Sequence, residues 1–155
     1  MAVKKIPEGY HAVTPYLAVK GGAAAIAFYE KAFGAKELFR MPAPGGTIAH
    51  AELQIGDSRV MLSDEAPDMG AKSPQTLGGS PVSLMLYVED VDATVKRAID
   101  AGAKPTRPVE NQFYGDRSGG IIDPFGHSWW VATHVEDVPP AELERRAKAA
   151  FAQKK

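Results

Sequence analysis

The sequence contains no cysteine among its 155 residues. It therefore has no disulfide bond, no thiolate ligand for a metal and no cysteine nucleophile. The lack of cysteine suits the reducing cytosol. Near the N-terminus, two lysines are followed by Pro7, Glu8 and Gly9, where a secretory signal peptide needs an apolar run. We therefore expect a cytoplasmic protein.

An excess of charge of either sign is also missing. The formal net charge is -1, with 18 basic and 19 acidic residues, and the basic residues are scattered along the chain. Such a balance provides no broad positive field to attract nucleic acid or anionic lipid. No uninterrupted apolar run approaches the roughly 20 residues of a membrane-spanning helix. The sequence thus predicts neither a nucleic-acid partner nor a membrane partner.

What the chain does contain is a globular composition and an internal repeat. Hydrophobic residues make up 45% and charged residues 24%, as in folded domains. The segment YLAVKGGAAAIAFYEKAFGAKE in the first half aligns with LMLYVEDVDATVKRAIDAGAKP in the second, with a single gap. The offset of about 68 residues is too long for a solenoid repeat. It predicts a duplicated half-domain.

Each half shows the same order of elements. In the first, residues 12–19 are rich in β-formers, and Ile26, Tyr29 and Phe33 then recur at helical spacing. Three further strand-like runs follow in each half. The sequence therefore predicts an α+β fold in which two tandem βαβββ modules form a curled mixed β-sheet with a central cleft. The expected ranges are residues 10–66 for the first module, 67–81 for a linker rich in Pro, Gly and Ser, and 82–137 for the second module.

The last segment, residues 138–155, is predicted to form an appended helix. It follows Pro139 and Pro140, which separate it from the last strand. Its apolar side chains recur at helical spacing on one side. They are Leu143, Ala147, Ala150 and Phe151.

Several segments carry a family resemblance. DPFGHSW, from Asp123 to Trp129, is similar to the hairpin that ends most domains of the vicinal oxygen chelate superfamily, which comprises glyoxalase, bleomycin-resistance and extradiol dioxygenase proteins. Together with Phe28-Tyr29 and Phe33-Gly34 in AAAIAFYEKAFGAKE, it resembles the PhnB-like, glyoxalase-like branch. The resemblance covers residues 10–137 and implies the same fold. Because this fold hosts many chemistries, the resemblance alone assigns no single activity.

The resemblance also implies where a metal would bind. Members with metal chemistry hold a divalent ion in the cleft through His, Gln or Glu on the first and last strands of each half. These positions fall at or next to Thr14, Met61, Ser83 and Trp130. Two hydroxyls, a thioether and an indole do not hold Zn²⁺, Ni²⁺ or Fe²⁺ against water. We therefore expect no metal at these positions and no cofactor.

His50 and Glu52 are the first candidates for a ligand site. They alternate with Ala51 and Leu53 in a strand-like run, so the apolar residues face the helix and the polar pair faces the cleft or solvent. In the cleft, Glu52 would raise the proton affinity of the imidazole and make His50 a candidate general base. Alternatively, this polar face is simply solvated.

Further candidates come from the second half. Tyr114 and Arg117 would hold an anionic or carbonyl-bearing ligand, unless Arg117 forms a local ion pair with Asp116. Trp129 and Trp130 are neighbours on a strand and point to opposite faces. We expect Trp130 to face the cleft, where its indole either stacks on a flat ligand or fills the space.

These residues favour a protein that binds or sequesters a small molecule in the shared cleft. The expected ligand contacts are His50, Glu52, Tyr114, Arg117 and Trp130. The alternative is an enzyme of the same superfamily, with lyase or metal-free isomerase-type chemistry and His50 as base, or with a metal relocated to His50 and Glu52. A third possibility is a dimer partner whose cleft is filled by its own side chains.

We also expect a homodimer, with the clefts close to or shared across the interface. Related domains commonly pair, and two short sheets leave edges that must be paired or covered. The apolar side of the C-terminal segment must also be buried somewhere, and a twofold contact would use the same patch on both chains.

Overall fold

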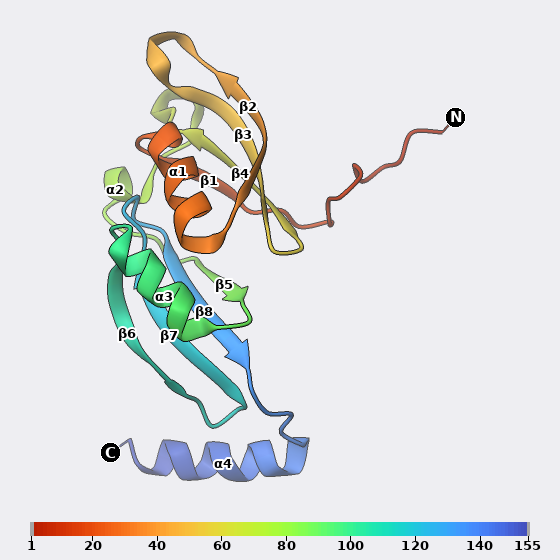
Figure 1. Cartoon of the computed structure of the whole chain (residues 1–155), viewed down its shortest axis with the longest axis vertical. Helices are drawn as coiled ribbons and strands as arrows, with labels where there is room; N and C mark the ends of the chain where they lie inside the picture. The colour runs from red at the N-terminus through yellow and green to blue at the C-terminus, as the bar shows by residue number, and fades with distance from the viewer. Residues whose placement is uncertain (1, 155) are drawn as a thin grey trace.

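The structure is a computed structural model that describes residues 2–154. Its two modules follow one another along the long axis, and the C-terminal helix lies across the far end (Figure 1). The first module consists of β1 (Tyr16–Val19), α1 (Gly22–Phe33), β2 (Lys36–Pro42), the 3₁₀ turn η1 (Pro44–Gly46), β3 (Ile48–Ile55) and β4 (Ser58–Asp64). The second consists of β5 (Ser83–Tyr87), α3 (Val91–Asp100), β6 (Lys104–Asn111), β7 (Asp116–Ile122) and β8 (Ser128–His134). The remaining elements are η2 (Pro67–Met69), α2 (Pro74–Leu77) and α4 (Pro140–Ala152).

Each module forms one four-stranded mixed sheet. The strand orders are β1-β4-β3-β2 and β5-β8-β7-β6. In both sheets the first and last strands of the module pair in parallel, and all other pairs are antiparallel. A parallel pair requires a long crossover, which the helix and the two intervening strands supply. The predicted α+β fold of two βαβββ modules with a C-terminal helix is confirmed.

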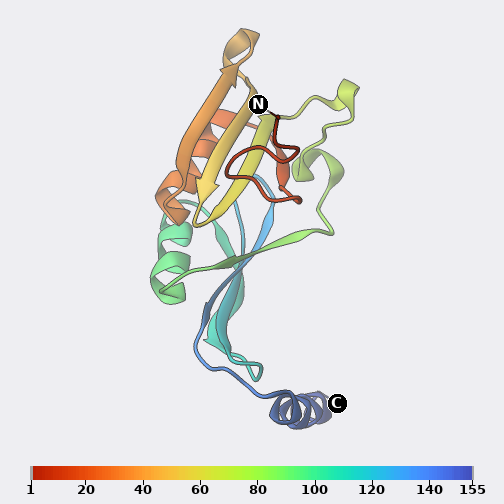
Figure 2. The ribbon, with the colours of Figure 1, turned by 90° about the vertical axis from the view of Figure 1, so that its right-hand side faces the viewer.

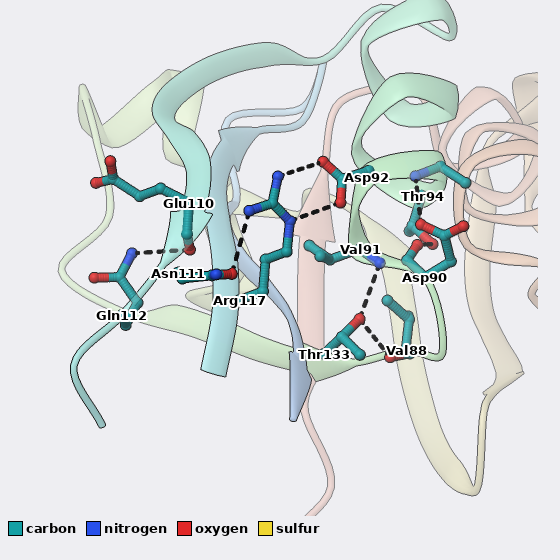
Figure 3. A network of polar contacts seen from close by, with 11 residues as sticks. Val88, Asp90, Val91, Asp92, Thr94, Glu110, Asn111, Gln112, Arg117 and Thr133 are labelled. Carbon is teal, nitrogen blue, oxygen red and sulfur yellow. Dashed lines mark hydrogen bonds and ion pairs between the residues drawn. The ribbon is translucent and has the colours of Figure 1, made fainter. Parts of the chain in front are cut away.

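At the N-terminus of each crossover helix, backbone N–H groups donate hydrogen bonds to a side chain at the end of the last strand of the same module. In the first module, the Asp64 carboxylate accepts hydrogen bonds from the backbone N–H groups of Gly21 and Gly22, at 2.8 and 3.0 Å. In the second, the Thr133 hydroxyl accepts one from the backbone N–H of Val91 at 2.9 Å (Figure 3). Gly22 is favoured, because a Cβ there would lie 2.8 Å from both an Asp64 oxygen and the Cβ of Ile48. The matching contacts satisfy free N–H groups at equivalent helix ends and support a duplicated half-domain.

The two modules share one core. Helices α1 and α3 pack against each other on one side of the sheets, and the N-terminal segment and the linker lie on the other side (Figure 2). Tyr29 and Phe33 of α1 contact Trp129 of β8, with ring centroids 5.6 and 4.8 Å apart. All three side chains are buried. These aromatic contacts across the junction join the halves.

The segment predicted as a linker is ordered by Glu65. This carboxylate accepts hydrogen bonds from the hydroxyls of Ser73 and Thr76, each at 2.6 Å. Ser73 also caps α2 by accepting a bond from the backbone N–H of Thr76. The linker is thereby fixed beside the first module.

Helix α4 has no buried residue. It is attached mainly by Arg146, which donates to the Glu136 carboxylate and to the backbone carbonyl of Phe113. Lys155, the last residue of the predicted extension 138–155, lies outside the described residues. Within residues 2–154, no helix is long and apolar enough to cross a membrane.

Candidate functional site

A cavity of about 550 Å³ lies between the two modules. Its wall combines β1 of the first module, Leu84 of the second, the linker around α2, and His127 in the turn before β8. The lining is mainly apolar, and its polar side chains are those of Lys72, His127, Tyr16, Ser63, Ser80 and Ser128. A concave, mostly apolar space at the junction of two halves is the usual setting of a small-molecule site.

His127 holds the wall of this cavity in place. Its ring Nε2 lies 2.9 Å from the backbone carbonyl of Ala18 in β1, so this nitrogen carries a proton and donates it. The backbone N–H of His127 in turn donates to Asp123 at 3.0 Å. The imidazole therefore ties the final hairpin of one module to the first strand of the other.

His50 and Glu52 lie on the face of the first sheet that is turned away from α1. Their neighbours Ala51 and Leu53 are fully buried on the helix side, as the alternation predicts. The His50 Nδ1 atom is 2.7 Å from the Tyr16 hydroxyl, and its Nε2 is 3.8 Å from the Glu52 carboxylate. The hydroxyl of Tyr10 donates to Glu52. Burial, followed by this bond to Glu52, raises the pKa of Tyr10 to about 12.

The sequence did not point to Tyr10 or Tyr16. Tyr10 comes from the N-terminal segment, which reaches over β3 and is fixed a second time by the bond from Arg59 Nε to the Gly9 carbonyl. Tyr16 is the first residue of β1. The four side chains form one polar row that runs from Tyr10 through Glu52 and His50 to Tyr16. Contacts between residues this far apart in sequence leave no local signal.

Trp129 and Trp130 lie on opposite faces of β8. Trp129 belongs to the core described above, and Trp130 is half-buried on the face turned away from α3. In the register of the second sheet, Trp130 stands between Met85 of β5 and Gly120 of β7. Thr106 fills the space beside Gly120, because a Cβ at this glycine would lie 2.6 Å from the Thr106 hydroxyl.

Arg117 lies on the other face of the second sheet, toward α3. Its guanidinium makes a bidentate ion pair with Asp92, at 2.8 and 2.9 Å, and a further bond to the Asn111 side chain (Figure 3). The local pair between Arg117 and Asp116 that the sequence offered as an alternative is not formed. Tyr114 sits in the turn between β6 and β7, with its ring 5.3 Å from Phe113.

The structure therefore does not gather the five predicted ligand residues. His50 and Glu52 lie on the first sheet, Trp130 on the second, and Tyr114 and Arg117 near the far end of the second module. None of these five described side chains lines the cavity between the modules. Their role in ligand binding stays a prediction.

A second polar cluster, which sequence reasoning missed, lies at the end of the second sheet. The buried carboxylate of Asp116 accepts a hydrogen bond from the Tyr87 hydroxyl at 2.8 Å and lies 2.7 Å from His134 Nδ1. His134 Nε2 is 2.8 Å from the exposed carboxylate of Asp137. On the same face, the hydroxyl of Ser118 is buried without a partner among the described residues. Asp116 and His134 meet through the register of β7 and β8, which no local pattern of the sequence reveals.

This cluster makes His134 sensitive to its acidic neighbours. The hydrogen bond to Asp116, and next the one to Asp137, raise the pKa of His134 above its ordinary value of 6.5. We expect Asp116→Asn to lower the pKa of His134 clearly, and Asp137→Asn to lower it less, as measured by NMR titration of the imidazole protons.

The raised pKa also sets the direction of a pH effect on stability. The contribution of His134 is fully present below pH 6.5 and is lost as the pH rises through the folded-state pKa. The wild type should therefore lose a little stability as the pH rises above 6.5, and His134→Asn should not show this loss. Urea unfolding at a series of pH values measures both. A measured pKa of His134 at or below 6.5 in the wild type would contradict its hydrogen bonds to Asp116 and Asp137.

The positions at which the superfamily binds metal do not fit one here. In the sheets, Met61 pairs with Tyr16, and Trp130 pairs with Met85. The first-strand positions thus lie two residues after Thr14 and Ser83, which the sequence had suggested. A phenol, two thioethers and an indole are a poor ligand set for a divalent ion. In the described part of the chain, no group of three or more His, Asp or Glu side chains is placed to hold a metal.

Comparison with known proteins identifies the family. The family model described as Glyoxalase/Bleomycin resistance protein/Dioxygenase superfamily matches residues 10–131. The chain belongs to this superfamily, as its resemblance predicted. An uncharacterized protein of Mycobacterium bovis is 47% identical over 136 residues, which cover 86% of this chain and 90% of the relative.

Solved structures agree with this assignment. TioX from Micromonospora sp. ML1 is 29% identical with a TM-score of 0.63, and the match covers 81% of this chain and 99% of TioX. A PhnB protein from Bacillus cereus is 18% identical with a TM-score of 0.60, over 79% of this chain and 99% of that one. At this identity the second likeness shows the fold alone.

Proposed function

We propose that the protein binds a small, largely apolar molecule in the cavity between its two modules. The observation that carries the proposal is the cavity itself, whose volume of about 550 Å³ suits a small organic molecule. Apolar side chains at its wall remain exposed in the single chain. Val13 is 87%, Leu77 64% and Val82 63% exposed. A ligand that covers them gains the free energy of removing apolar surface from water.

Filling the cavity should abolish binding. We use 2-naphthamide as a neutral, flat probe and expect a Kd of about 1 mM or tighter, from about 0.3 kcal/mol per non-hydrogen atom. Ala71→Trp places an indole in the cavity wall and should weaken binding at least about tenfold, because both groups need the same space. The measurement is ligand-observed NMR titration.

The matched control is Ala149→Trp, the same substitution at an exposed position of α4. It should bind the probe like the wild type. Equal binding by Ala71→Trp and the wild type would place the probe elsewhere and reject the proposal.

The polar row on the first sheet supports a second candidate function, an enzyme with His50 as general base. Tyr16 fixes one imidazole nitrogen, and Glu52 stands near the other. This arrangement leaves the ring oriented for proton transfer. An assay of lactoylglutathione formation, together with metal analysis of the purified protein, separates this candidate from binding alone. Turnover that His50→Gln removes without loss of probe binding favours the enzyme.

A further inference from the structure

We infer that the molecule bound in the cavity carries a negative charge of carboxylate type beside Lys72. The inference rests on the proposed function and adds the chemical class of the ligand. Lys72 is the one lysine or arginine among the described side chains that line the cavity, and no aspartate or glutamate lines it. A cavity wall with one cation and no anion is complementary to an anion.

The charge of Lys72 is available for a ligand. Among the ion pairs of residues 2–154, none includes Lys72. The acid at the base of the same segment, Glu65, is occupied by hydrogen bonds from Ser73 and Thr76. The hydrogen bond from Ser73, and next the one from Thr76, lower the pKa of Glu65. Its negative charge is therefore held at the N-terminus of α2. The ammonium group therefore stands beside an apolar space without a counter-charge.

Two hydroxyls of the wall are also able to donate. Ser63 and Ser128 line the cavity, and neither side-chain hydroxyl makes a hydrogen bond to another described residue. Each can turn its O–H toward an acceptor. His127 already donates through Nε2 to Ala18, which fixes the ring at the wall. An ammonium and two free hydroxyls match a group rich in acceptor oxygens, and the apolar surface around them matches an apolar body.

The test compares two probes of the same shape, 2-naphthoate and 2-naphthamide. In Lys72→Gln, binding of naphthoate should weaken about fivefold, because an exposed charge-assisted contact is lost, and binding of naphthamide should not change. Lys36→Gln, which removes an exposed lysine at the start of β2, is the matched control and should leave both affinities unchanged. Higher NaCl should weaken naphthoate binding to the wild type alone. Isothermal titration calorimetry measures these affinities.

The outcomes distinguish a failure of the carboxylate inference from a failure of the proposed binding function. A loss confined to naphthoate in Lys72→Gln, absent in Lys36→Gln, supports a carboxylate ligand. Equal effects of Lys72→Gln on both probes, or no effect on either, overturn the inference. If Ala71→Trp still blocks both probes in that case, the cavity keeps its function with a neutral ligand. If Ala71→Trp blocks neither probe, the proposed function fails and the inference fails with it.

Discussion

Replacing Asp123 by alanine is expected to lower the free energy of unfolding by about 3–5 kcal/mol. The carboxylate is 3% exposed and accepts four hydrogen bonds. Tyr29 and Trp129 donate to one oxygen at 2.5 and 2.9 Å. The backbone N–H groups of Phe125 and His127 donate to the other at 2.9 and 3.0 Å. Alanine leaves three buried donors and one part-buried donor unpaired at the junction of the modules.

A graded series distinguishes this network from a general effect of mutation. Tyr29→Phe removes one donor and keeps the carboxylate paired three times, so we expect a loss of about 1–2 kcal/mol. Asp68→Ala changes an exposed acid of η2 and should stay within about 0.5 kcal/mol of the wild type. Urea unfolding at pH 7 measures all three. A loss below about 1 kcal/mol for Asp123→Ala would show that the junction does not depend on this carboxylate.

The network gives a physical meaning to the motif that carried the family resemblance. In DPFGHSW, Asp123 closes the turn through backbone N–H groups and receives Trp129 from the following strand. It also receives Tyr29 from the helix of the other module. Burial, and then the charge of Asp123, raise the pKa of Tyr29 well above its usual value, so this phenol stays a donor at neutral pH. The motif is thus a clamp between the halves.

The fold could be predicted because its determinants are local and repeated. The alternation around Ala51 and Leu53 fixed which face of β3 meets the helix, and burial in the structure follows it. The same rule separated Trp129 from Trp130. Because the half-domain is duplicated, the same order of elements could be inferred twice, once from each half of the sequence. The periodicity of apolar residues and the internal repeat can both be recognised without knowing which distant residues are in contact.

The site could not be predicted to the same extent, because its contacts depend on register and on distant segments. Arg117 was expected beside a ligand or Asp116, yet a residue on β7 can point to either face, and Asp92 of α3 occupies its guanidinium. Tyr10 reaches Glu52 from an N-terminal segment without regular structure. The cavity needs β1, the linker and the final hairpin at once. No window of the sequence contains all three.

We propose that two copies of the chain pair, as its exposed apolar surface suggests. Tyr16, Met85 and Tyr87 are large and exposed on the edge strands β1 and β5. Each of these strands has a hydrogen-bonded partner on one side. Unpaired edges with apolar side chains are usually covered in the assembled protein. Helix α4 adds Phe151, which touches Phe113 at a centroid distance of 6.1 Å and is otherwise open.

Light scattering at micromolar concentration should therefore give a mass of about 33 kDa, twice that of one chain at 16.6 kDa. The variant Met85→Lys places a charge on the β5 edge and should shift the mass toward the single chain, because a buried unpaired charge opposes association. Leu38→Lys, on the exposed surface of β2, is the matched control and should leave the dimer intact. A wild-type mass near 17 kDa rejects the dimer.

Deletion of residues 139–155 then assigns the role of α4. Because no residue of α4 is fully buried in the single chain, a partner would cover the part of its apolar side chains that is still exposed. We therefore expect the deletion to weaken the dimer, seen as a mass that falls at lower protein concentration than for the full chain. A dimer unchanged by the deletion, together with a loss of stability in urea, would instead make α4 a cap on the β6–β7 hairpin of its own chain. A twofold contact through the β1 and β5 edges would then remain as the interface.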